Sequence, residues 1–368
     1  MSSRPLRPEP PAPARGLARR LRSGAYKLAS ALATPLVPDD YLDLVNPLRA
    51  GGPLRARVMS RRADTARTAT LTLRASADWA GHLPGQYVRI GVDIDGVRRW
   101  RAYSITSPPH ERDFTITVTT VDAGLVSTHL VHGDVLGTIV VLEQATGDFT
   151  VPDPPPEKVL LITGGSGITP VLGMLRAGAF TDSETVLLHS VSEASDLIAT
   201  EEFAAWKEAG RFDYRVRITR TDGHLKLADL DDVVPDWRDR HTWACGPAGL
   251  LDDCEGHWQM EGLEERLHVE RFRTQLAAVG EGGTVTFAAA ERSLDVDGAT
   301  PLLDAGEDAG ILMPSGCRMG ICFGCLAPLR HGSVRDLRDG TLTTGTDEDP
   351  VLVQTCVSAA AGACTIDL

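Results

Sequence analysis

One stretch near the C-terminal end guides the interpretation of the whole chain: Pro314-Ser-Gly-Cys317-Arg-Met-Gly-Ile-Cys322-Phe-Gly-Cys325. A further cysteine follows downstream in Leu352-Val-Gln-Thr-Cys356. The cysteines of the first stretch follow the spacing C-x4-C-x2-C, and the fourth cysteine arrives from a distant segment. This spacing is typical of thiolates that hold a [2Fe–2S] cluster. Glycines between the cysteines would let the loop wrap closely, because glycine tolerates positive φ. The sequence therefore predicts Cys317, Cys322, Cys325 and Cys356 as metal ligands.

Two other interpretations of these cysteines stay open, namely a structural zinc site and free thiols in a core. Zinc sites usually combine two C-x2-C pairs, whereas here only Cys322 and Cys325 form such a pair. The three remaining cysteines fall outside the pattern. We expect Cys245, Cys254 and Cys364 to be small buried hydrophobic side chains.

The segment that surrounds the cluster motif resembles the plant-type ferredoxins from about Gly283 to the end. Segments 284–287 and 293–296 predict a hairpin, and segment 301–306 predicts a helix that precedes the cysteine loop. This is the element order of a β-grasp. The resemblance implies an α+β ferredoxin domain over residues 284–368 that binds a [2Fe–2S] cluster.

Length and charge limit the remaining choices. A chain of 368 residues is long enough for two or three domains. Its net charge of −13 argues against nucleic acid as a partner, because phosphate binding needs a basic face. The sequence shows no run of membrane-spanning length and no secretory signal. Seven cysteines, four of them assigned to a metal, fit a reducing compartment, so we expect a cytoplasmic protein.

Residues 51–153 have the pattern of an antiparallel β-barrel. Segments 69–74, 86–92 and 113–119 alternate apolar and polar residues between turns rich in glycine, proline and aspartate. Asp95-Gly96 predicts a hairpin turn. A small barrel of this kind can hold a flat ligand in a polar groove.

The chemistry of that groove is indicated by Arg101-Ala-Tyr103-Ser104. An arginine can bind a pyrophosphate, the aromatic ring two residues on projects from the same strand face, and a serine hydroxyl can donate to a ring nitrogen. The motif is similar to the R-x-Y-S element of the ferredoxin–NADP reductase family. The resemblance implies that Arg101 contacts flavin phosphates, Tyr103 packs on the isoalloxazine and Ser104 hydrogen-bonds near N5.

A second element, Gly124-Leu-Val126-Ser127, resembles the G-x-V-S segment of the same family. That resemblance implies that backbone N–H groups and a hydroxyl from Gly124, Val126 and Ser127 bind the FAD pyrophosphate. Phthalate-dioxygenase-type reductases share this domain order but use FMN, with a glycine-rich element at this position. We therefore expect FAD here. No catalytic acid or base is assigned, because hydride transfer to a flavin needs none.

Residues 154–273 predict an α/β domain with a parallel sheet. After the stiff boundary Pro152-Asp-Pro-Pro-Pro156, an apolar strand at 158–163 leads into Gly164-Gly-Ser-Gly-Ile-Thr-Pro170 and a helix. Glycines at the carboxyl end of such a strand let N–H groups face a pyrophosphate. The loop resembles the nicotinamide-dinucleotide loop of the reductase family, which implies cofactor binding by Gly164, Gly165, Gly167 and Thr169.

Further along, segments 185–191, 198–206 and 213–219 continue the strand–helix–strand pattern. Thr242-Trp-Ala-Cys245-Gly246-Pro247 ends another strand and matches the C-G-P element of the same family. The match implies that Cys245, Gly246 and Pro247 lie at the nicotinamide site, and a buried core thiol is the alternative for Cys245. We expect residues 274–283 to link this domain to the ferredoxin.

Coenzyme preference should be set where the second strand ends, because an arginine there pairs with a 2′-phosphate and an acid holds a ribose diol. The chain has Ser190-Val-Ser192-Glu193 at this point, and Arg220 follows the next strand. The serines with a nearby arginine favour NADPH, whereas Glu193 favours NADH. Both coenzymes stay open.

Residues 1–50 differ from the rest of the chain. Seven basic residues precede position 28 against the single acid Glu9, and segment 24–35 predicts a short helix ended by proline. One expectation is a loose arm followed by a packed helix. The other is a basic arm that contacts an anionic membrane surface, at the inner face of the membrane, or an acidic partner.

The three domains together predict a function that none of them carries alone. A nicotinamide delivers two electrons as hydride and a [2Fe–2S] cluster accepts one, and a flavin can exchange both. We expect an NAD(P)H-dependent reductase that passes electrons through FAD and the cluster to a separate protein. The whole arrangement, with Thr34–Tyr41, resembles reductases of membrane acyl-CoA desaturases. Reductases of ring-hydroxylating, alkane or P450 oxygenases are alternatives, and so is an iron–sulfur redox sensor.

Overall fold

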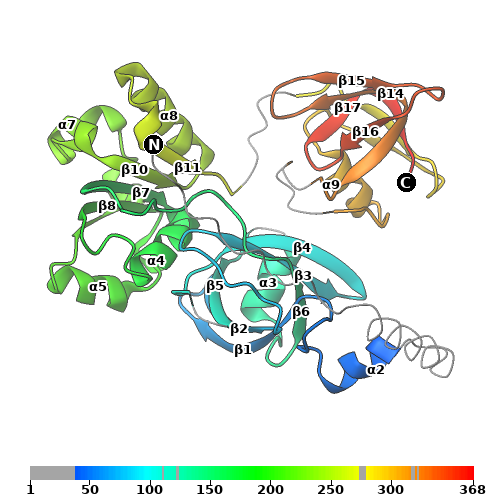
Figure 1. The fold of residues 1–368 in the computed structure, drawn as a ribbon. Helices are drawn as coiled ribbons and strands as arrows, with labels where there is room; N and C mark the ends of the chain where they lie inside the picture. Colours follow the sequence, from blue (N-terminus) through cyan, green and yellow to red (C-terminus); the bar gives the residue numbers. More distant parts are fainter. Residues whose placement is uncertain (1–37, 110–111, 122–123, 273–278, 316–319, 321–322) are drawn as a thin grey trace, which may run out of the picture.

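The computed structural model describes residues 38–109, 112–121, 124–272, 279–315, 320 and 323–368. In this part of the chain, three sheets form three modules in sequence order (Figure 1). The first described helix, α2 (Pro38–Val45), precedes the first module. The basic arm and the helix expected at 24–35 lie outside the described residues.

The first module is the expected antiparallel barrel, with strand order β4-β3-β6-β1-β2-β5. A bridge between Ile105 and Ile116 joins the two edges of this sheet. Asp95 and Gly96 both have positive φ, 51° and 79°, as a tight hairpin turn requires. The elements are β1 (Arg55–Ala63), β2 (Thr68–Ala75), β3 (Tyr87–Ile94), β4 (Val97–Ser104), β5 (Asp113–Thr119), α3 (Leu125–His132) and β6 (Ile139–Leu142).

The second module has a five-stranded parallel sheet with the order β11-β10-β7-β8-β9. Apolar cores lie on both faces, one containing side chains of α4 and α5 and the other side chains of α7 and α8. The strands are β7 (Lys158–Gly164), β8 (Glu184–Val191), β9 (Asp213–Ile218), β10 (His241–Cys245) and β11 (Leu267–Glu270). The helices are α4 (Ile168–Arg176), α5 (Thr200–Glu208), α6 (Thr219–Asp222), α7 (Leu230–Val233) and α8 (Ala248–Glu261).

This strand order creates a switch point between β7 and β10. The chain proceeds from β7 outward through β8 and β9, then returns to the other side of β7 with β10. Loops that follow adjacent strands at such a point leave a crevice at the carboxyl edge of the sheet, where ligands bind. The predicted nucleotide loop and the C-G-P element follow these two strands.

The third module is the expected β-grasp. Its strands follow the order β13-β12-β17-β14-β15, with β16 paired to β14, and β12 runs parallel to β17. Its elements are β12 (Gly283–Phe287), β13 (Arg292–Val296), α9 (Leu302–Asp308), β14 (Leu326–Asp336), β15 (Leu342–Gly345), β16 (Val351–Gln354) and β17 (Ser358–Ile366). Part of the expected linker is tied to this module, because Gly280 N donates to Gly298 O and Gly282 N to Ala360 O.

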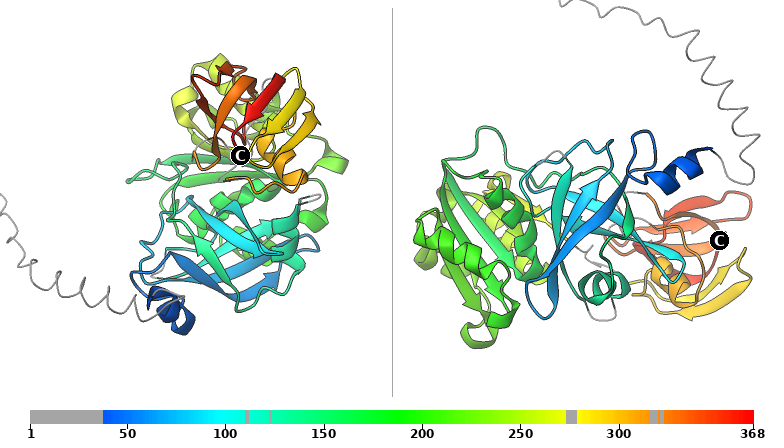
Figure 2. Two further views of the ribbon diagram at one scale, coloured as in Figure 1. Left: turned by 90° about the vertical axis from the view of Figure 1, so that its right-hand side faces the viewer. Right: turned by 90° about the horizontal axis from the view of Figure 1, so that it is seen from below.

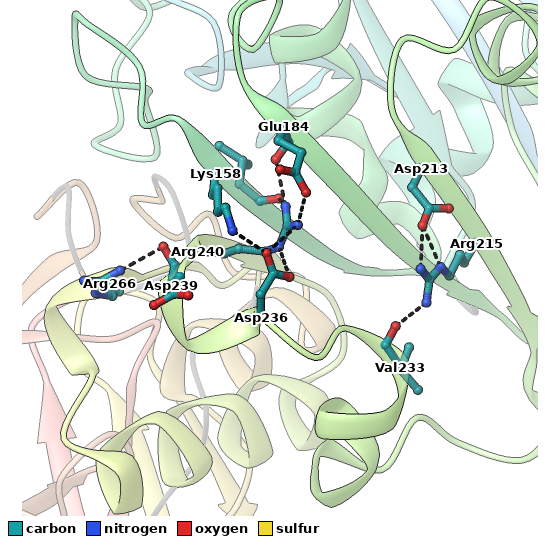
Figure 3. A network of polar contacts seen from close by, with 10 residues as sticks. Lys158, Glu184, Asp213, Arg215, Val233, Asp236, Asp239, Arg240 and Arg266 are labelled. Carbon is teal, nitrogen blue, oxygen red and sulfur yellow. Dashed lines mark hydrogen bonds and ion pairs between the residues drawn. The ribbon is translucent and has the colours of Figure 1, made fainter.

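A charged network closes the amino end of the parallel sheet, opposite the nucleotide loop (Figure 3). Arg240, whose side chain is 3% exposed, donates to Asp236 at 2.8 Å and also pairs with Glu184. Lys158 donates to Asp236 as well, at 2.8 Å. A hollow of about 500 Å³ lies beside this network. Because these charges are paired with one another, we interpret the network as structural.

A membrane-crossing helix would have to be long and apolar. The described segments contain no helix that meets both conditions.

Candidate flavin, nucleotide and cluster sites

The end of β4 carries the predicted flavin residues. Arg101 and Tyr103 are partly buried on one face of the strand, and Tyr103 packs against the barrel core. Burial raises the pKa of the Tyr103 phenol, so the ring stays neutral. The Ser104 hydroxyl is buried and has no hydrogen-bond partner among the described residues. A buried hydroxyl without a partner is costly, and a flavin ring nitrogen would satisfy it.

The second predicted flavin element lies at the start of α3. Gly124 is the residue before the helix, and a Cβ there would meet Ser127 Oγ at 2.6 Å. Val126 is fully buried in the barrel core. The Ser127 hydroxyl accepts a hydrogen bond from Val121 N and donates to Gly124 O, both at 3.2 Å. The hydroxyl thus stabilises the turn, and the backbone N–H groups at the start of α3 are the groups that can bind a phosphate.

The nucleotide loop and the C-G-P element meet at the switch point. A Cβ on Gly167 would lie 2.2 Å from Cys245 O, and one on Gly164 would lie 2.6 Å from the Pro247 ring. Gly165 has a φ of +54° and open space where its Cβ would be. These glycines allow the two loops to touch and leave the backbone exposed beyond them. The cradle fits the phosphates of a dinucleotide.

Two side chains predicted at this site are already engaged within the protein. The Thr169 hydroxyl donates to Ser166 O at 2.9 Å and is buried. Cys245 is completely buried, and burial raises the pKa of its thiol well above the usual value. Cys245 is therefore a neutral thiol and not a nucleophile. Gly246 directly follows Cys245, and a Cβ on it would lie 3.0 Å from Gly164 N.

One acidic residue beside this site was not predicted. Glu270 ends β11 and is paired in register with Cys245 on β10. Burial raises the pKa of the Glu270 carboxyl to about 8, and its Oε2 has no partner among the described residues. The register of β10 and β11 is what reveals Glu270 as a neighbour of Cys245.

Helix α4 connects the nucleotide loop with the flavin strand. It begins directly after the glycine loop, and Gly173 approaches so closely that a Cβ would lie 2.3 Å from Ile105 O. Arg176, one helical turn further, donates to Thr106 O at 2.8 Å and pairs with Glu202 at 2.7 Å. Because Ile105 and Thr106 directly follow Ser104, the helix fixes the two sites relative to each other.

Arg220, the arginine considered for coenzyme preference, lies beside the residues that follow β8. Arg220 N donates to Ser192 O at 3.4 Å, and Arg220 Nη1 lies 2.5 Å from Glu193 Oε1. Ser190 is half-buried and Ser192 is exposed. The arginine thus reaches the end of β8, and it pairs there with the acid.

The cluster site is described in part. Cys325 and Cys356 are buried, 1% and 6% exposed, and their Sγ atoms lie 3.2 Å apart. Hydrogen bonding to Cys356 lowers the pKa of the Cys325 thiol. Metal–thiolate bonds are about 2.3 Å long, so two sulfurs at this separation can bind one metal ion. The other predicted ligands, Cys317 and Cys322, lie outside the described residues.

Two residues that brace the cluster loop were not predicted. Gly320 O accepts hydrogen bonds from Arg338 Nη1 and Gln354 Nε2, both at 2.8 Å. Arg338 is held in turn by Asp336 at 2.6 Å. These bonds fix the carbonyl of Gly320, which lies between Cys317 and Cys322 in the sequence. The three cysteines left out of the ligand set, Cys245, Cys254 and Cys364, are buried as expected.

Comparison with protein-family models identifies all three modules. The oxidoreductase FAD-binding domain matches residues 57–151, the oxidoreductase NAD-binding domain matches 161–255, and the 2Fe-2S iron-sulfur cluster binding domain matches 285–361. These matches support FAD, NAD(P)H and a [2Fe–2S] cluster as the cofactors, rather than zinc.

Known proteins resemble the chain over most of its length. An NADPH oxidoreductase of Mycobacterium tuberculosis (strain ATCC 25618 / H37Rv) is 46% identical, covering 93% of this chain and 91% of that protein. The glycine betaine monooxygenase reductase subunit of Chromohalobacter salexigens is 28% identical over 74% of this chain and 84% of its own. The structure of phthalate dioxygenase reductase shares the fold, with a TM-score of 0.60, 22% identity and coverage of 86% and 98%.

Proposed function

The chain belongs to the family of NAD(P)H-dependent oxidoreductases that carry an FAD-binding, an NAD-binding and a [2Fe–2S] domain, and we propose that it supplies electrons to a membrane fatty-acyl desaturase. It is an electron-transfer reductase of the type that serves oxygenase systems, with a protein as electron acceptor. The proposal concerns the identity of that acceptor, the residues that bind each cofactor and the preferred coenzyme.

The single observation that carries the proposed electron path is the course of α4. This helix starts at the glycine loop, and its last residue, Arg176, donates to Thr106 O, just beyond the flavin motif. The helix thereby holds the switch point, which would bind the nicotinamide, next to the end of β4, which would bind the flavin. Bound FAD would accept the hydride and release electrons one at a time. The protein's part is to hold the reacting groups close and to exclude water.

We propose the residues of each site as follows. The end of β4 and the start of α3 bind FAD, the switch point binds the nicotinamide coenzyme, and four thiolates hold the cluster. The proposed set is Arg101, Tyr103, Ser104, Gly124, Val126 and Ser127 for FAD, Gly164, Gly165, Gly167, Thr169, Cys245, Gly246 and Pro247 for the coenzyme, and Cys317, Cys322, Cys325 and Cys356 for the cluster.

For the coenzyme we propose NADPH. The support is the position of Arg220 beside Ser192, where its guanidinium can leave Glu193 for a phosphate. The similar mycobacterial protein is also named an NADPH oxidoreductase. Replacing Arg220 by alanine should raise the KM for NADPH about tenfold and leave that for NADH unchanged, since one exposed charged hydrogen bond is lost. Equal changes for both coenzymes would refute this assignment.

The acceptor can be tested by reconstitution. The purified protein is combined with an acyl-CoA desaturase in vesicles, or with a soluble ring-hydroxylating oxygenase, and NADPH oxidation coupled to product is measured. Coupled desaturation supports the proposal. Coupling only to the oxygenase would favour the alternative that the names of the monooxygenase and dioxygenase relatives suggest. A cluster that NADPH reduces only slowly would instead point to a redox sensor.

We also propose that the basic arm contacts the membrane where such an acceptor is embedded. Residues 1–30 carry the excess of arginine, and polybasic segments bind anionic lipid surfaces. Deleting them should abolish sedimentation with vesicles that contain phosphatidylserine and leave flavin reduction by NADPH intact. Unchanged sedimentation would rule out this contact.

A further inference from the structure

An ion pair joins the flavin module to the ferredoxin module. Arg99 Nη1 on β4 lies 4.0 Å from Glu307 Oε2 on α9, and the two side chains are only 23% and 18% exposed. In Figure 1, α9 lies on the side of the ferredoxin module that is turned toward β4. The two views of Figure 2 likewise place the ferredoxin module against the barrel. A shielded contact of this kind is screened less by salt than an exposed one.

Arg99 occupies a special place on its strand. Successive side chains of a strand alternate between faces, so Arg99, Arg101 and Tyr103 project from the same face of β4. Two of these three are proposed flavin residues. Arg99 is the next position along that face, and its Nε is buried without a partner among the described residues. The strand that holds the flavin therefore also reaches the ferredoxin module.

Glu307 occupies a corresponding place on the cluster side. It lies in α9, whose residues Leu302 and Leu303 are fully buried in the ferredoxin core. A Cβ on Gly306, its neighbour, would lie 2.5 Å from Met313 Sδ, so the helix and the segment before the cluster loop are in close contact. Met313 directly precedes Pro314, where the cysteine motif begins. Helix α9 therefore packs against the segment that leads into the cluster motif.

We infer that the contact between Arg99 and Glu307 is the docking pair that sets the position of the [2Fe–2S] module relative to the flavin. The inference rests on the proposed electron path and adds the residues that align its two internal sites. Each turnover moves two electrons as one hydride from NAD(P)H. They leave one at a time through the cluster to two equivalents of a one-electron acceptor, and one proton is released to solvent. Arg99 and Glu307 are positioning residues, and neither takes part in the transfer itself.

The neighbouring Arg98 provides a matched control. It projects from the opposite face of β4, and its guanidinium pairs with Asp93 at 2.8 Å within the hairpin. Its side chain is 48% exposed. A charge lost at Arg98 changes the net charge of the hairpin as much as one lost at Arg99. Only the latter removes a contact between modules.

The test uses the full-length protein loaded with FAD and cluster, in five variants. Three change the pair itself: Arg99→Glu, Glu307→Arg and the double charge swap. The other two, Arg98→Gln and Arg99→Gln, are compared with each other. Stopped-flow absorbance separates flavin reduction by NADPH from the later reduction of the cluster. Small-angle scattering of the oxidised protein, without coenzyme, gives the radius of gyration as a readout that is independent of activity.

We expect Arg99→Glu to slow cluster reduction about tenfold, within the range of coupling between contacting residues, and to increase the radius of gyration. Flavin reduction should keep its rate, and Arg98→Gln should match the wild type in every readout. The charge swap should restore both cluster reduction and compactness, because it reverses the pair without removing it.

An unchanged rate of cluster reduction in Arg99→Glu, or a swap no better than that single variant, would overturn the inference. An Arg98→Gln variant as slow as Arg99→Gln would also overturn it, because general charge would then be responsible. Failure of the wild-type flavin to accept electrons from NADPH would count against the proposed electron path. The radii of gyration of the variants would still show whether Arg99 and Glu307 hold the two modules together.

Discussion

At the residue scale, Ser104 tests the flavin site with little disturbance of the fold. Its hydroxyl is buried and has no partner among the described residues, so Ser104→Ala removes no hydrogen bond from that part of the protein. We expect the rate of flavin reduction by NADPH to fall about tenfold, because a hydrogen bond contributes ~1 kcal/mol or slightly more. Stopped-flow absorbance at the flavin band measures this rate. The exposed Ser60→Ala variant is the control, and a rate in Ser104→Ala equal to it would remove Ser104 from the site.

Glu270 predicts a pH dependence at the same scale. Burial raises the pKa of its carboxyl to about 8 from the ordinary value of 4.5. Between these values the folded state binds a proton that the unfolded state has lost. Stability therefore falls as the pH rises through this window, by at most ~1.4 kcal/mol per pH unit.

Glu270→Gln should remove that fall. Its melting temperature, followed by tryptophan fluorescence, should exceed that of the wild type at pH 8 and approach it near pH 5. The exposed Glu261→Gln variant serves as the control. Its hydrogen bond with Arg238 lowers the pKa of the Glu261 carboxyl, so this carboxyl does not titrate in the same window. A constant difference between Glu270→Gln and the wild type from pH 5 to 8 would contradict the assignment.

At the element scale, the approach of α4 to β4 depends on one glycine. Gly173→Ala places a Cβ 2.3 Å from Ile105 O and should push the helix off the flavin strand. Overpacking of this kind costs about 1–3 kcal/mol. We expect slower flavin reduction by NADPH and a lower melting temperature. Gly256→Ala in α8 is a matched control, because its Cβ meets nothing within 4 Å. It should stabilise the helix by ~0.5–1 kcal/mol.

The cluster loop depends on a contact with Arg338, which lies just after β14. Arg338 donates to Gly320 O at 2.8 Å, and Gly320 lies between the first two cysteines of the motif. Arg338→Ala should lower the cluster content of the purified protein several-fold and leave its flavin content unchanged, because a buried carbonyl loses a charged partner. Iron per protein and the visible absorbance measure this. Arg330→Ala, which breaks an exposed pair with Asp367, should keep full iron content.

At the scale of the whole molecule, the sequence predicts the three modules because each contains local patterns. Asp95-Gly96 requires a hairpin, and the nucleotide and C-G-P loops meet because each follows a strand of one parallel sheet. The neighbours Glu270 and Cys245 carry no such local signal. Their contact depends on the register of two strands.

The same holds for contacts between distant segments, both inside the ferredoxin module and between modules. The bond from Arg338 to Gly320 joins β14's end to a loop 18 positions away, and Arg99 and Glu307 lie 208 positions apart. No periodicity or spacing marks either pair, because each is created by packing. Residues that bind a cofactor recur in motifs, whereas residues that position one module against another are found only in the folded chain.

The most direct test of the whole account is an anaerobic absorbance titration of the purified protein with NADPH. We predict that the flavin and the iron–sulfur bands both bleach, and that Cys356→Ser loses the cluster band while its flavin is still reduced. A wild-type protein without a cluster band, or one whose cluster stays oxidised while its flavin bleaches, would contradict the proposed path from NADPH through FAD to the [2Fe–2S] cluster.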